Sequence, residues 1–248
     1  MLSDSELERY SRQLMLPGFE LEQQARLRAA TVLVVGCGGL GNPLALYLAA
    51  AGVGGVILAD GDQVERSNLH RQILFTEADL GHSKAVVAAR VIGTRFVQCT
   101  TRVLEKQLRA EDLVAAVSEA NLVADCSDNY ATRFALNRAC IASGTPLVSA
   151  AAIRSEGQLT TLDPARGGPC YRCIYPSEET GTALACRDSG VMGPVVGVLG
   201  TLQALEVIKN LSGWGETLRG KLLLLDLYTN EQRLLLIDKK QACPDCSS

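Results

Sequence analysis

Residues 31–60 constrain the fold more than any other stretch of this 248-residue sequence, because they follow a strand, turn, helix and strand pattern. The β-branched run at 32–35 predicts a buried strand, and glycines at positions 36, 38, 39 and 41 crowd into the turn after it. We expect a helix over 44–51 and a second strand over 56–59. Such a unit lets a phosphate approach backbone N–H groups, and Asp60 at the second strand end can bind ribose hydroxyl groups.

Residues 31–59 carry no charged side chain, which raises the alternative of a membrane-spanning segment. The glycines and Pro43 within this stretch favour buried parallel strands and a short helix, so no membrane association is expected. A net charge of −3 gives no basic character that would indicate nucleic-acid binding. The first residues contain early acids and no apolar core, unlike a signal peptide, so the nine cysteines indicate a reducing, cytoplasmic compartment.

Helix and strand patterns continue along the chain and predict one domain over residues 1–248. Ser3 and Glu6 fit a capping box at the start of a first helix. Further helices are expected over 20–30, 82–92, 110–119, 132–143 and 193–211, and strands over 97–103, 122–128, 146–153, 157–162, 220–227 and 231–238. The predicted fold class is α/β: a Rossmann-like, doubly wound, mostly parallel sheet that continues into an antiparallel part. Residues 1–30 would form N-terminal helices and 31–153 the nucleotide-binding part.

A group of charged residues is expected around the glycine turn at positions 36–41. These residues are Arg12, Asp60, Arg71, Lys84 and Asp128. Arginine and lysine side chains can neutralise a triphosphate, and a carboxylate at a strand end can hold Mg²⁺. Any one of these residues alone would more often be an ordinary surface charge. The glycine turn with Asp60 also fits a nicotinamide-dependent oxidoreductase, and a non-catalytic nucleotide-binding scaffold is a third alternative. The cations together with Asp128 suit a triphosphate and a metal better than a dinucleotide.

Two Cys-x-x-Cys pairs, Cys170-Tyr-Arg-Cys173 and Cys243-Pro-Asp-Cys246, have the spacing of metal ligands. Together they can supply four thiolates to one tetrahedral Zn²⁺ ion in a closed, structural site. Two separate redox motifs or surface thiols are the alternatives. The cysteines at 37, 99, 126 and 140 lie in apolar elements and are expected to be core residues.

Cys186 has a different setting, because it follows the polar segment 177–185 and lies beside Arg187. It also precedes the helix expected from residue 193. An accessible cysteine in electropositive surroundings can have a lowered thiol pKa. Cys186 is therefore a candidate nucleophile, with a structural thiol as an equally weighted alternative.

The combined motifs resemble those of the MoeB/ThiF family, prokaryotic relatives of ubiquitin-activating enzymes, over nearly the whole chain. The matching residues are Arg9-Tyr-Ser-Arg-Gln13, Gly36-x-Gly-Gly-Leu-Gly41, Asp60-x-Asp62, Ser67-Asn-Leu-x-Arg-Gln72, Lys84, Asp125-Cys-Ser-Asp-Asn129 and both Cys-x-x-Cys pairs. The resemblance implies a homodimeric adenylyltransferase. Such an enzyme would use ATP and Mg²⁺ to adenylate the C-terminal carboxylate of a ubiquitin-like sulfur-carrier protein that ends in Gly-Gly, with release of pyrophosphate.

The resemblance also implies roles for individual residues. Gly39 would lie against the nucleotide, Asp60 would bind the ribose, and Asp128 would coordinate Mg²⁺ with Asn129 beside it. Arg12 would reach the phosphates from the neighbouring subunit. The implied nucleotide site comprises Gly39, Asp60, Ser67, Asn68, Leu69, His70, Arg71, Lys84, Asp128 and Asn129, and the implied catalytic residues are Arg12, Arg71, Asp128 and Cys186.

Separate segments resemble different branches of the family. Residues 151–158 are more similar to enzymes of molybdopterin synthesis, whereas residues 10–13 and 193–197 also suit the thiamine branch. Both branches have a cysteine at the position of Cys186. Residues 154–248 would bind the carrier and zinc. No rhodanese-like domain follows, so a separate sulfurtransferase or cysteine desulfurase is expected to supply sulfur. One departure is Ile92-Gly-Thr-Arg-Phe-Val97, where the family usually has Leu-Asn-Pro.

Overall fold

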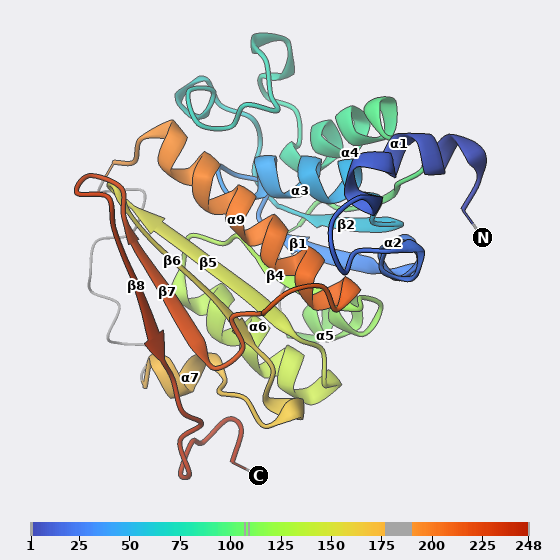
Figure 1. The fold of residues 1–248 in the computed structure, drawn as a ribbon. Helices are drawn as coiled ribbons and strands as arrows, with labels where there is room; N and C mark the ends of the chain where they lie inside the picture. Colours follow the sequence, from blue (N-terminus) through green and yellow to red (C-terminus); the bar gives the residue numbers. More distant parts are fainter. Residues whose placement is uncertain (1, 107, 109, 177–189, 248) are drawn as a thin grey trace.

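The computed structural model describes residues 2–106, 108, 110–176 and 190–247, which form one sheet of eight strands flanked by helices. The strands lie in the order β3-β2-β1-β4-β5-β6-β7-β8 (Figure 1). Their bounds are β1 Thr31–Val35, β2 Gly55–Ala59, β3 Thr100–Leu104, β4 Leu122–Asp125, β5 Leu147–Ile153, β6 Glu156–Leu162, β7 Lys221–Asp226 and β8 Glu231–Leu236. Cys186 and the segment 177–185 lie outside the described residues.

Strands β1 to β5 are parallel, with β1 and β4 side by side in the middle of this part of the sheet. β1 pairs with β2 in the register Thr31↔Gly55 and with β4 in the register Val32↔Leu122. The chain leaves β1 toward one face of the sheet and leaves β4 toward the other, so a crevice opens where the two connections diverge. Ligands of doubly wound proteins bind at this switch point. The predicted doubly wound, mostly parallel sheet is confirmed.

Strands β5 to β8 form the antiparallel part, as the alternating C-terminal segments predict. β5 and β6 join through a two-residue turn in which Arg154 has a positive φ of 55°. The turn between β7 and β8 ends at Asn230, also at positive φ, a conformation that asparagine tolerates. β8 is an edge strand, and its leucines at 234–236 are exposed.

Helices cover both faces of the sheet, so the molecule has three layers (Figure 1). Their bounds are α1 Asp4–Leu14, α2 Leu21–Ala29, α3 Gly41–Ala50, α4 Lys84–Arg95, α5 Ala110–Ser118, α6 Tyr130–Ser143, α7 Tyr171–Ile174 and α9 Gly193–Ser212. Side chains of β1 alternate between the two resulting cores. Val32 and Val34 pack in the core that contains α3, α4 and α9, whereas Leu33 and Val35 pack in the core of α5 and α6.

Helix α9 is long and apolar enough to cross a membrane by length and composition alone, and it is the one such helix among the described residues. In the fold it packs against α3, β5 and β6, and half of its apolar stretch is buried. Its buried polar side chains have partners: Gln203 donates to the Asp125 and Val148 carbonyl groups, and Glu206 accepts from Thr161. These are the features of a core helix, which its near lack of charge predicts.

Several boundaries differ from those expected. α3 begins at Gly41 rather than at 44, so the glycine turn leads directly into the helix. β4 ends at Asp125 rather than at 128, because Asn129 caps α6 and the chain must leave the sheet before it. The first helix has the predicted capping box, and its Tyr10 is buried.

Candidate functional site

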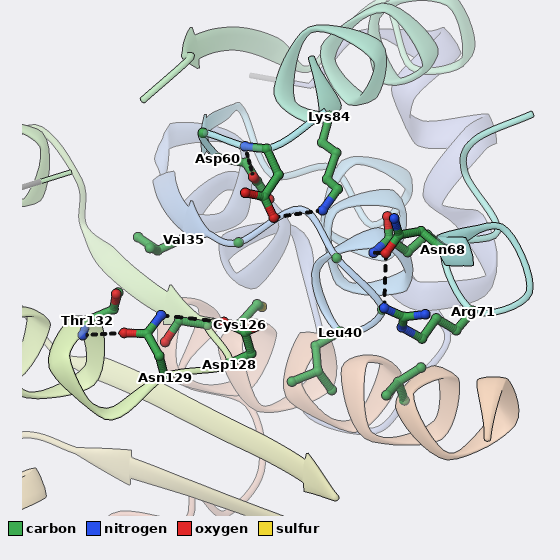
Figure 2. Close-up of a pocket in the computed structure, with 18 of the residues that line it drawn as sticks. Val35, Leu40, Asp60, Asn68, Arg71, Lys84, Cys126, Asp128, Asn129 and Thr132 are labelled. Carbon is green, nitrogen blue, oxygen red and sulfur yellow. Dashed lines mark hydrogen bonds and ion pairs between the residues drawn. The ribbon is translucent and has the colours of Figure 1, made fainter. Parts of the chain in front are cut away.

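A cavity of about 700 Å³ opens at the carboxyl ends of β1, β2 and β4, at the switch point of the sheet. Most residues of the predicted nucleotide site line it, namely Gly39, Asp60, Ser67, Asn68, His70, Arg71, Lys84, Asp128 and Asn129. Figure 2 shows Asp128 and Asn129 on one side of this cavity, with Asn68, Arg71 and Lys84 on the other. A ligand between the two walls would therefore meet cations on one side and a carboxylate on the other.

The glycine turn is packed so closely that side chains could not replace two of its glycines. Gly36 has a φ of 95°, and a Cβ there would lie 2.7 Å from the carbonyl oxygen of Cys126. A Cβ on Gly41 would lie 2.0 Å from the carbonyl oxygen of Gly36. The turn therefore rests directly against the loop after β4, and α3 begins at the cavity with its positive dipole end.

Asp60 holds the glycine turn in shape. One carboxylate oxygen accepts from the Cys37 N–H at 2.6 Å, and the other accepts from the Asp62 N–H at 2.8 Å. Burial raises the pKa of the Asp60 carboxyl, and the two backbone N–H groups oppose part of this effect. Each carboxylate oxygen can accept more than one hydrogen bond, so Asp60 can support the turn and also bind a ribose hydroxyl group.

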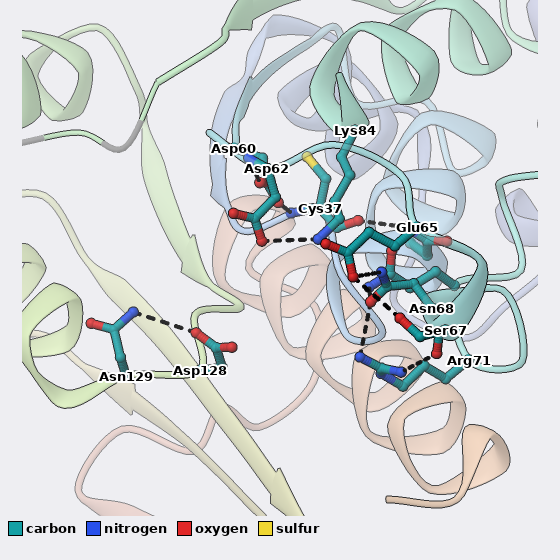
Figure 3. Close-up of polar contacts among 12 residues, drawn as sticks. Cys37, Asp60, Asp62, Glu65, Ser67, Asn68, Arg71, Lys84, Asp128 and Asn129 are labelled. Carbon is teal, nitrogen blue, oxygen red and sulfur yellow. Dashed lines mark hydrogen bonds and ion pairs between the residues drawn. The ribbon is translucent and has the colours of Figure 1, made fainter. Parts of the chain in front are cut away.

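The segment after Asp62 fixes an arginine at the cavity. It begins with a short 3-10 helix, η1 (Arg66–Asn68). The Arg71 guanidinium donates to the Asn68 side-chain oxygen and to the Ser67 carbonyl, both at 3.0 Å (Figure 3). Ser67 and His70 line the cavity, but Leu69 does not, because its side chain packs against the core.

Lys84 is the first residue of α4, and its side chain is only 7% exposed. Its ammonium group forms an ion pair with Asp62 at 3.0 Å, next to Asp60 (Figure 3). A buried ammonium group needs an anionic partner to offset its lost hydration, and Asp62 supplies one. Because Lys84 also lines the cavity, its charge acts on any anion bound there.

Asp128 and Asn129 lie in the connection from β4 to α6. The Asn129 side-chain oxygen accepts from the Thr132 N–H at 2.9 Å, which makes Asn129 the N-cap of α6. Its amide nitrogen lies 3.4 Å from an Asp128 carboxylate oxygen, to which it donates. The Asp128 carboxylate is exposed at the cavity and has the chemistry to coordinate a hard cation.

Two buried residues without a predicted role support this loop. Asp125 is fully buried and accepts hydrogen bonds from the side chains of Ser127 and Ser149. Arg133 lines the cavity and donates to the Ser127 carbonyl at 2.7 Å. The sequence contains one signal that could have predicted the position of Arg133. It lies one helical turn after the N-cap Asn129, so its side chain is at the same end of α6 as Asn129.

Arg12 is the predicted catalytic residue that, among those the structure describes, does not line the cavity. It is exposed on α1, and Tyr10 of the same helix lies against Gly52, just beyond the C-terminal end of α3. The cavity lies at the opposite end of this 10-residue helix, about 15 Å away. Arg12 is therefore remote from the cavity of its own chain, which is compatible with its implied action on a neighbouring subunit.

A second cluster brings Cys170, Cys173, Cys243 and Cys246 together in the interior. All four sulfur atoms lie within 4.8 Å of one another, and three Sγ–Sγ distances are 3.6, 3.7 and 3.9 Å. A metal ion about 2.3 Å from four tetrahedral thiolates gives Sγ–Sγ edges of about 3.8 Å. The donor set therefore fits one metal ion, and the predicted association of the two motifs is confirmed.

Residues around the cysteine cluster tie it to α6. Asp245 accepts from the Asn137 side chain at 3.0 Å and forms an ion pair with Arg172 at 2.9 Å. The Asn137 oxygen in turn accepts from the Tyr171 N–H at 2.7 Å. Helix α6 thus runs from the cavity, at its cap, to the cysteine cluster.

A family model for the ThiF family matches residues 10–247 of this chain. The chain belongs to the ThiF family. The resemblance inferred from the sequence motifs is therefore confirmed. The match includes the glycine turn, the loop that carries Asp128 and all four clustered cysteines, so both sites described above lie inside the ThiF-family region.

Two relatives match nearly all residues of this ThiF-family chain. It is 48% identical over 250 residues to the adenylyltransferase and sulfurtransferase MOCS3 of Bos taurus, a match that covers 100% of this chain and 54% of that protein. It is 45% identical over 245 residues to the sulfur carrier protein ThiS adenylyltransferase of Escherichia coli K12, covering 99% and 97%. The chain therefore spans about half the length of the MOCS3 relative.

Solved structures of E. coli MccB share the fold of this ThiF-family chain. MccB with ATP superposes with a TM-score of 0.85 at 25% identity, covering 97% of this chain and 75% of that one. MccB with MccA-N7isoASN gives a TM-score of 0.86 at 24% identity, covering 99% and 76%. The predicted fold class, a parallel sheet that continues into an antiparallel part, is thus that of a solved protein.

Proposed function

We propose that this chain is an ATP-dependent adenylyltransferase that acts on a ubiquitin-like sulfur-carrier protein ending in Gly-Gly. The observation that carries the proposal is the cavity, in which the glycine turn, Arg71 and Lys84 face Asp128. The names of the relatives, a ThiS adenylyltransferase and an adenylyltransferase and sulfurtransferase, support the same reaction class. The similarity to MccB solved with ATP supports the choice of nucleotide.

In the proposed reaction, a carboxylate oxygen of the carrier C-terminus forms a bond to the α-phosphorus of ATP. The bond from that phosphorus to the bridging oxygen breaks, and pyrophosphate leaves. No proton has to move, because the nucleophile is already an anion. The barrier arises mainly from repulsion between the carboxylate and the phosphates, and fixed cations such as Arg71 and Lys84 lower it without reorganising.

The residues on the other wall complete the proposed site. Asp128 would hold Mg²⁺, whose charge would further offset that of the phosphates. Asn129 orients the Asp128 carboxylate from the cap of α6. Asp60 would bind the ribose while it keeps the glycine turn in shape. Holding both reactants in one geometry would then lower the barrier further.

We also propose a homodimer in which Arg12 of one subunit serves the cavity of the other. The neighbouring helices α3 and α9 support such an interface, because they expose the large apolar side chains Tyr47, Val198 and Leu205. Large apolar side chains that are exposed on neighbouring helices favour a surface that a partner covers. Arg12 needs this arrangement, since it is remote from the cavity of its own chain.

For the cysteine cluster we propose Zn²⁺ in a closed, structural site. Zn²⁺ accepts four thiolates in tetrahedral geometry and leaves no open position for catalysis. The Sγ–Sγ distances and the burial of all four cysteines support this assignment. The ion would join α7, which contains Cys173 and has Cys170 as its N-cap, to residues 243–246.

The proposed enzyme is one adenylating domain over residues 1–248 that acts in the cytoplasm. Residues 154–248 would bind the carrier, and the exposed leucines on the unpaired edge of β8 support this, because such an edge can receive a partner strand. The carrier belongs to molybdopterin or thiamine synthesis. A separate sulfurtransferase or cysteine desulfurase would supply the sulfur.

Cys186 is proposed to act after adenylation, as a nucleophile in sulfur transfer. Carboxylate attack on ATP contains no step for a thiol, so Cys186→Ala should keep adenylation close to the wild-type rate. Sulfur transfer to the carrier should stop in the same variant.

Carrier-dependent exchange of labelled pyrophosphate into ATP tests the proposed function. The protein is incubated with ATP and Mg²⁺ together with a molybdopterin-type or a thiamine-type carrier. Label should enter ATP with at least one carrier, and a carrier without its last glycine is the matched control. Exchange with neither carrier would contradict the proposal. The oxidoreductase and the non-catalytic scaffold would then remain. Reduction of NAD by the protein would indicate the oxidoreductase, and nucleotide binding without turnover would indicate the scaffold.

A further inference from the structure

Asn42 is a buried asparagine that joins two segments lining the cavity. It is the second residue of α3 and is 1% exposed. Its side-chain amide donates to the Cys37 carbonyl at 2.7 Å, and its side-chain oxygen accepts from the Leu74 N–H at 2.9 Å. Cys37 lies in the glycine turn, and Leu74 follows the segment that carries Arg71.

Both backbone groups that Asn42 binds lie outside the helices and strands, so their hydrogen bonds must come from elsewhere. Asparagine presents a donor nitrogen and an acceptor oxygen on the same amide carbon and can satisfy both groups at once. Aspartate keeps only the acceptors, and leucine, of similar size, has neither. The chemistry of this position therefore demands an amide in order to keep the turn and the Arg71 segment together.

The remainder of the Arg71 segment is held in the same frame. Gln72 donates to the Asn68 side-chain oxygen at 3.1 Å, and the same oxygen accepts from Arg71. Gln72 also lies against the glycine turn, because a Cβ on Gly38 would be 3.6 Å from its amide nitrogen. A continuous set of contacts thus runs from the turn to the Arg71 guanidinium.

We propose that Asn42 is a positioning residue that sets the distance between the glycine turn and Arg71, so that both contact one phosphate chain. The inference rests on the proposed ATP site and deepens it. ATP has to satisfy the turn and Arg71 together, whereas AMP has too few phosphates to need both. Loss of the Asn42 contacts should therefore weaken ATP binding selectively and leave the affinity for the carrier unchanged.

Asn42→Leu tests this selectivity in the full-length protein with Mg²⁺ present. Calorimetry should show that the Kd for ATP rises about tenfold while the Kd for AMP changes less than about twofold. In pyrophosphate exchange, the KM for ATP should rise and the KM for the carrier should stay the same. Equal losses for ATP and AMP would overturn the proposal, because they would indicate a general disturbance of the site.

Asn137→Leu is the matched control, because Asn137 is equally buried and also donates and accepts through its side chain. It lies at the cysteine cluster, away from the cavity. This variant should lose stability without changing the ratio of the ATP and AMP affinities. If Asn42→Leu does not fold, Asn42→Ser provides the same comparison, since serine is too short to bridge Cys37 and Leu74.

A double-mutant cycle with Arg71→Ala tests the mechanism. If Asn42 acts through Arg71, adding Asn42→Leu to Arg71→Ala should change the Kd for ATP by less than about twofold. A tenfold effect in both backgrounds would refute action through Arg71. Failure of this proposal can be distinguished from failure of the proposed function. If the wild-type protein binds ATP but shows no pyrophosphate exchange, the proposed function is wrong. If the wild-type protein is active and Asn42→Leu binds ATP with unchanged affinity, the positioning role is wrong.

Discussion

Single residues in the cavity have their positions fixed by protein partners before any ligand binds. Arg71 is held by Asn68 and Ser67, and Lys84 is held by Asp62. Groups that are already oriented stabilise developing or repelling charges without a cost of reorganisation during the reaction. The folded protein thus supplies the arrangement of charge that the proposed adenylation requires.

Arg71→Ala should abolish carrier-dependent pyrophosphate exchange, a loss of at least about a hundredfold, or about 2.7 kcal/mol in the barrier. Arg66→Ala is the control, because Arg66 lies five positions earlier and its side chain is 76% exposed in an ion pair with Glu77. It should keep exchange within about twofold, since exposed ion pairs contribute little. Asp128→Asn should behave like Arg71→Ala. Wild-type exchange in either site variant, with normal circular dichroism, would contradict the proposed roles.

At the scale of elements, sequence patterns are sufficient where the signal is local. The strand–turn–helix unit, the capping box at Ser3, the glycine that ends α6 and the antiparallel C-terminal strands all follow from neighbouring residues. Hydrogen bonds between distant residues could not be predicted in this way. Ser149 of β5 reaches Asp125 on the neighbouring strand β4, and Leu74 reaches Asn42 from a different loop, so only the tertiary fold brings these pairs together.

For the cavity residues, too, some positions follow from local sequence and others depend on the tertiary fold. The spacing of the motif around Arg71 predicted that it would lie near the glycine turn, but the inward packing of Leu69 depends on the core beneath it. Asn129 was expected beside Mg²⁺ from the motif, and the structure adds its capping of α6. Local spacing therefore identified the segments, while packing decided which side chain of each segment faces the cavity.

Helix α4 contains a glycine, Gly93, that another residue could replace. It belongs to the segment 92–97, which departs from the usual family sequence. Gly93 lies within the helix, is exposed, and a Cβ there would meet nothing within 4 Å. Gly93→Ala should therefore raise the free energy of unfolding by about 0.5–1 kcal/mol, because alanine loses less backbone entropy in a helix. Urea unfolding measures the change. A decrease in stability would show that the glycine has a role that the fold does not reveal.

At the scale of the whole molecule, the cysteine cluster joins segments that are far apart in the sequence. Cys170 and Cys173 precede the residues that lead to α9, and Cys243 and Cys246 follow β8. Because Asp245 contacts Asn137 on α6, the cluster also braces the helix that begins just after Asp128 and Asn129. A metal ion there would stabilise the architecture around the cavity without taking part in the reaction.

Metal analysis should find about one zinc ion per chain, as a four-thiolate site requires. Cys173→Ala should contain no zinc and should melt at a lower temperature, because metal binding contributes directly to folding. Cys140→Ala is the control, since Cys140 is a buried cysteine outside the cluster and should keep its zinc. Wild-type protein without zinc, with all four cluster thiols freely titratable, would contradict the assignment.

A shared active site predicts recovery of activity in mixed dimers. Arg12→Ala and Asp128→Asn proteins should each be inactive, because each removes one part of every site. In a hybrid dimer, one cavity keeps Asp128 and receives Arg12 from the other subunit. Random exchange of equal amounts should restore about a quarter of the wild-type rate, since half of the dimers are hybrid and each has one complete site. No recovery after demonstrated subunit exchange would argue against action of Arg12 across the interface.

The strand order of the sheet also determines when the cavity can form during folding. From β4 onward, each strand pairs with the next one along the chain, whereas β1 pairs with β4 across the whole intervening part of the domain. Distant pairings close a longer loop and form more slowly than local hairpins. The walls of the cavity stand on either side of the β1–β4 pairing. The onset of ATP binding during refolding would therefore report when β1 and β4 pair. The glycine turn, which is a local structure, can form long before that step.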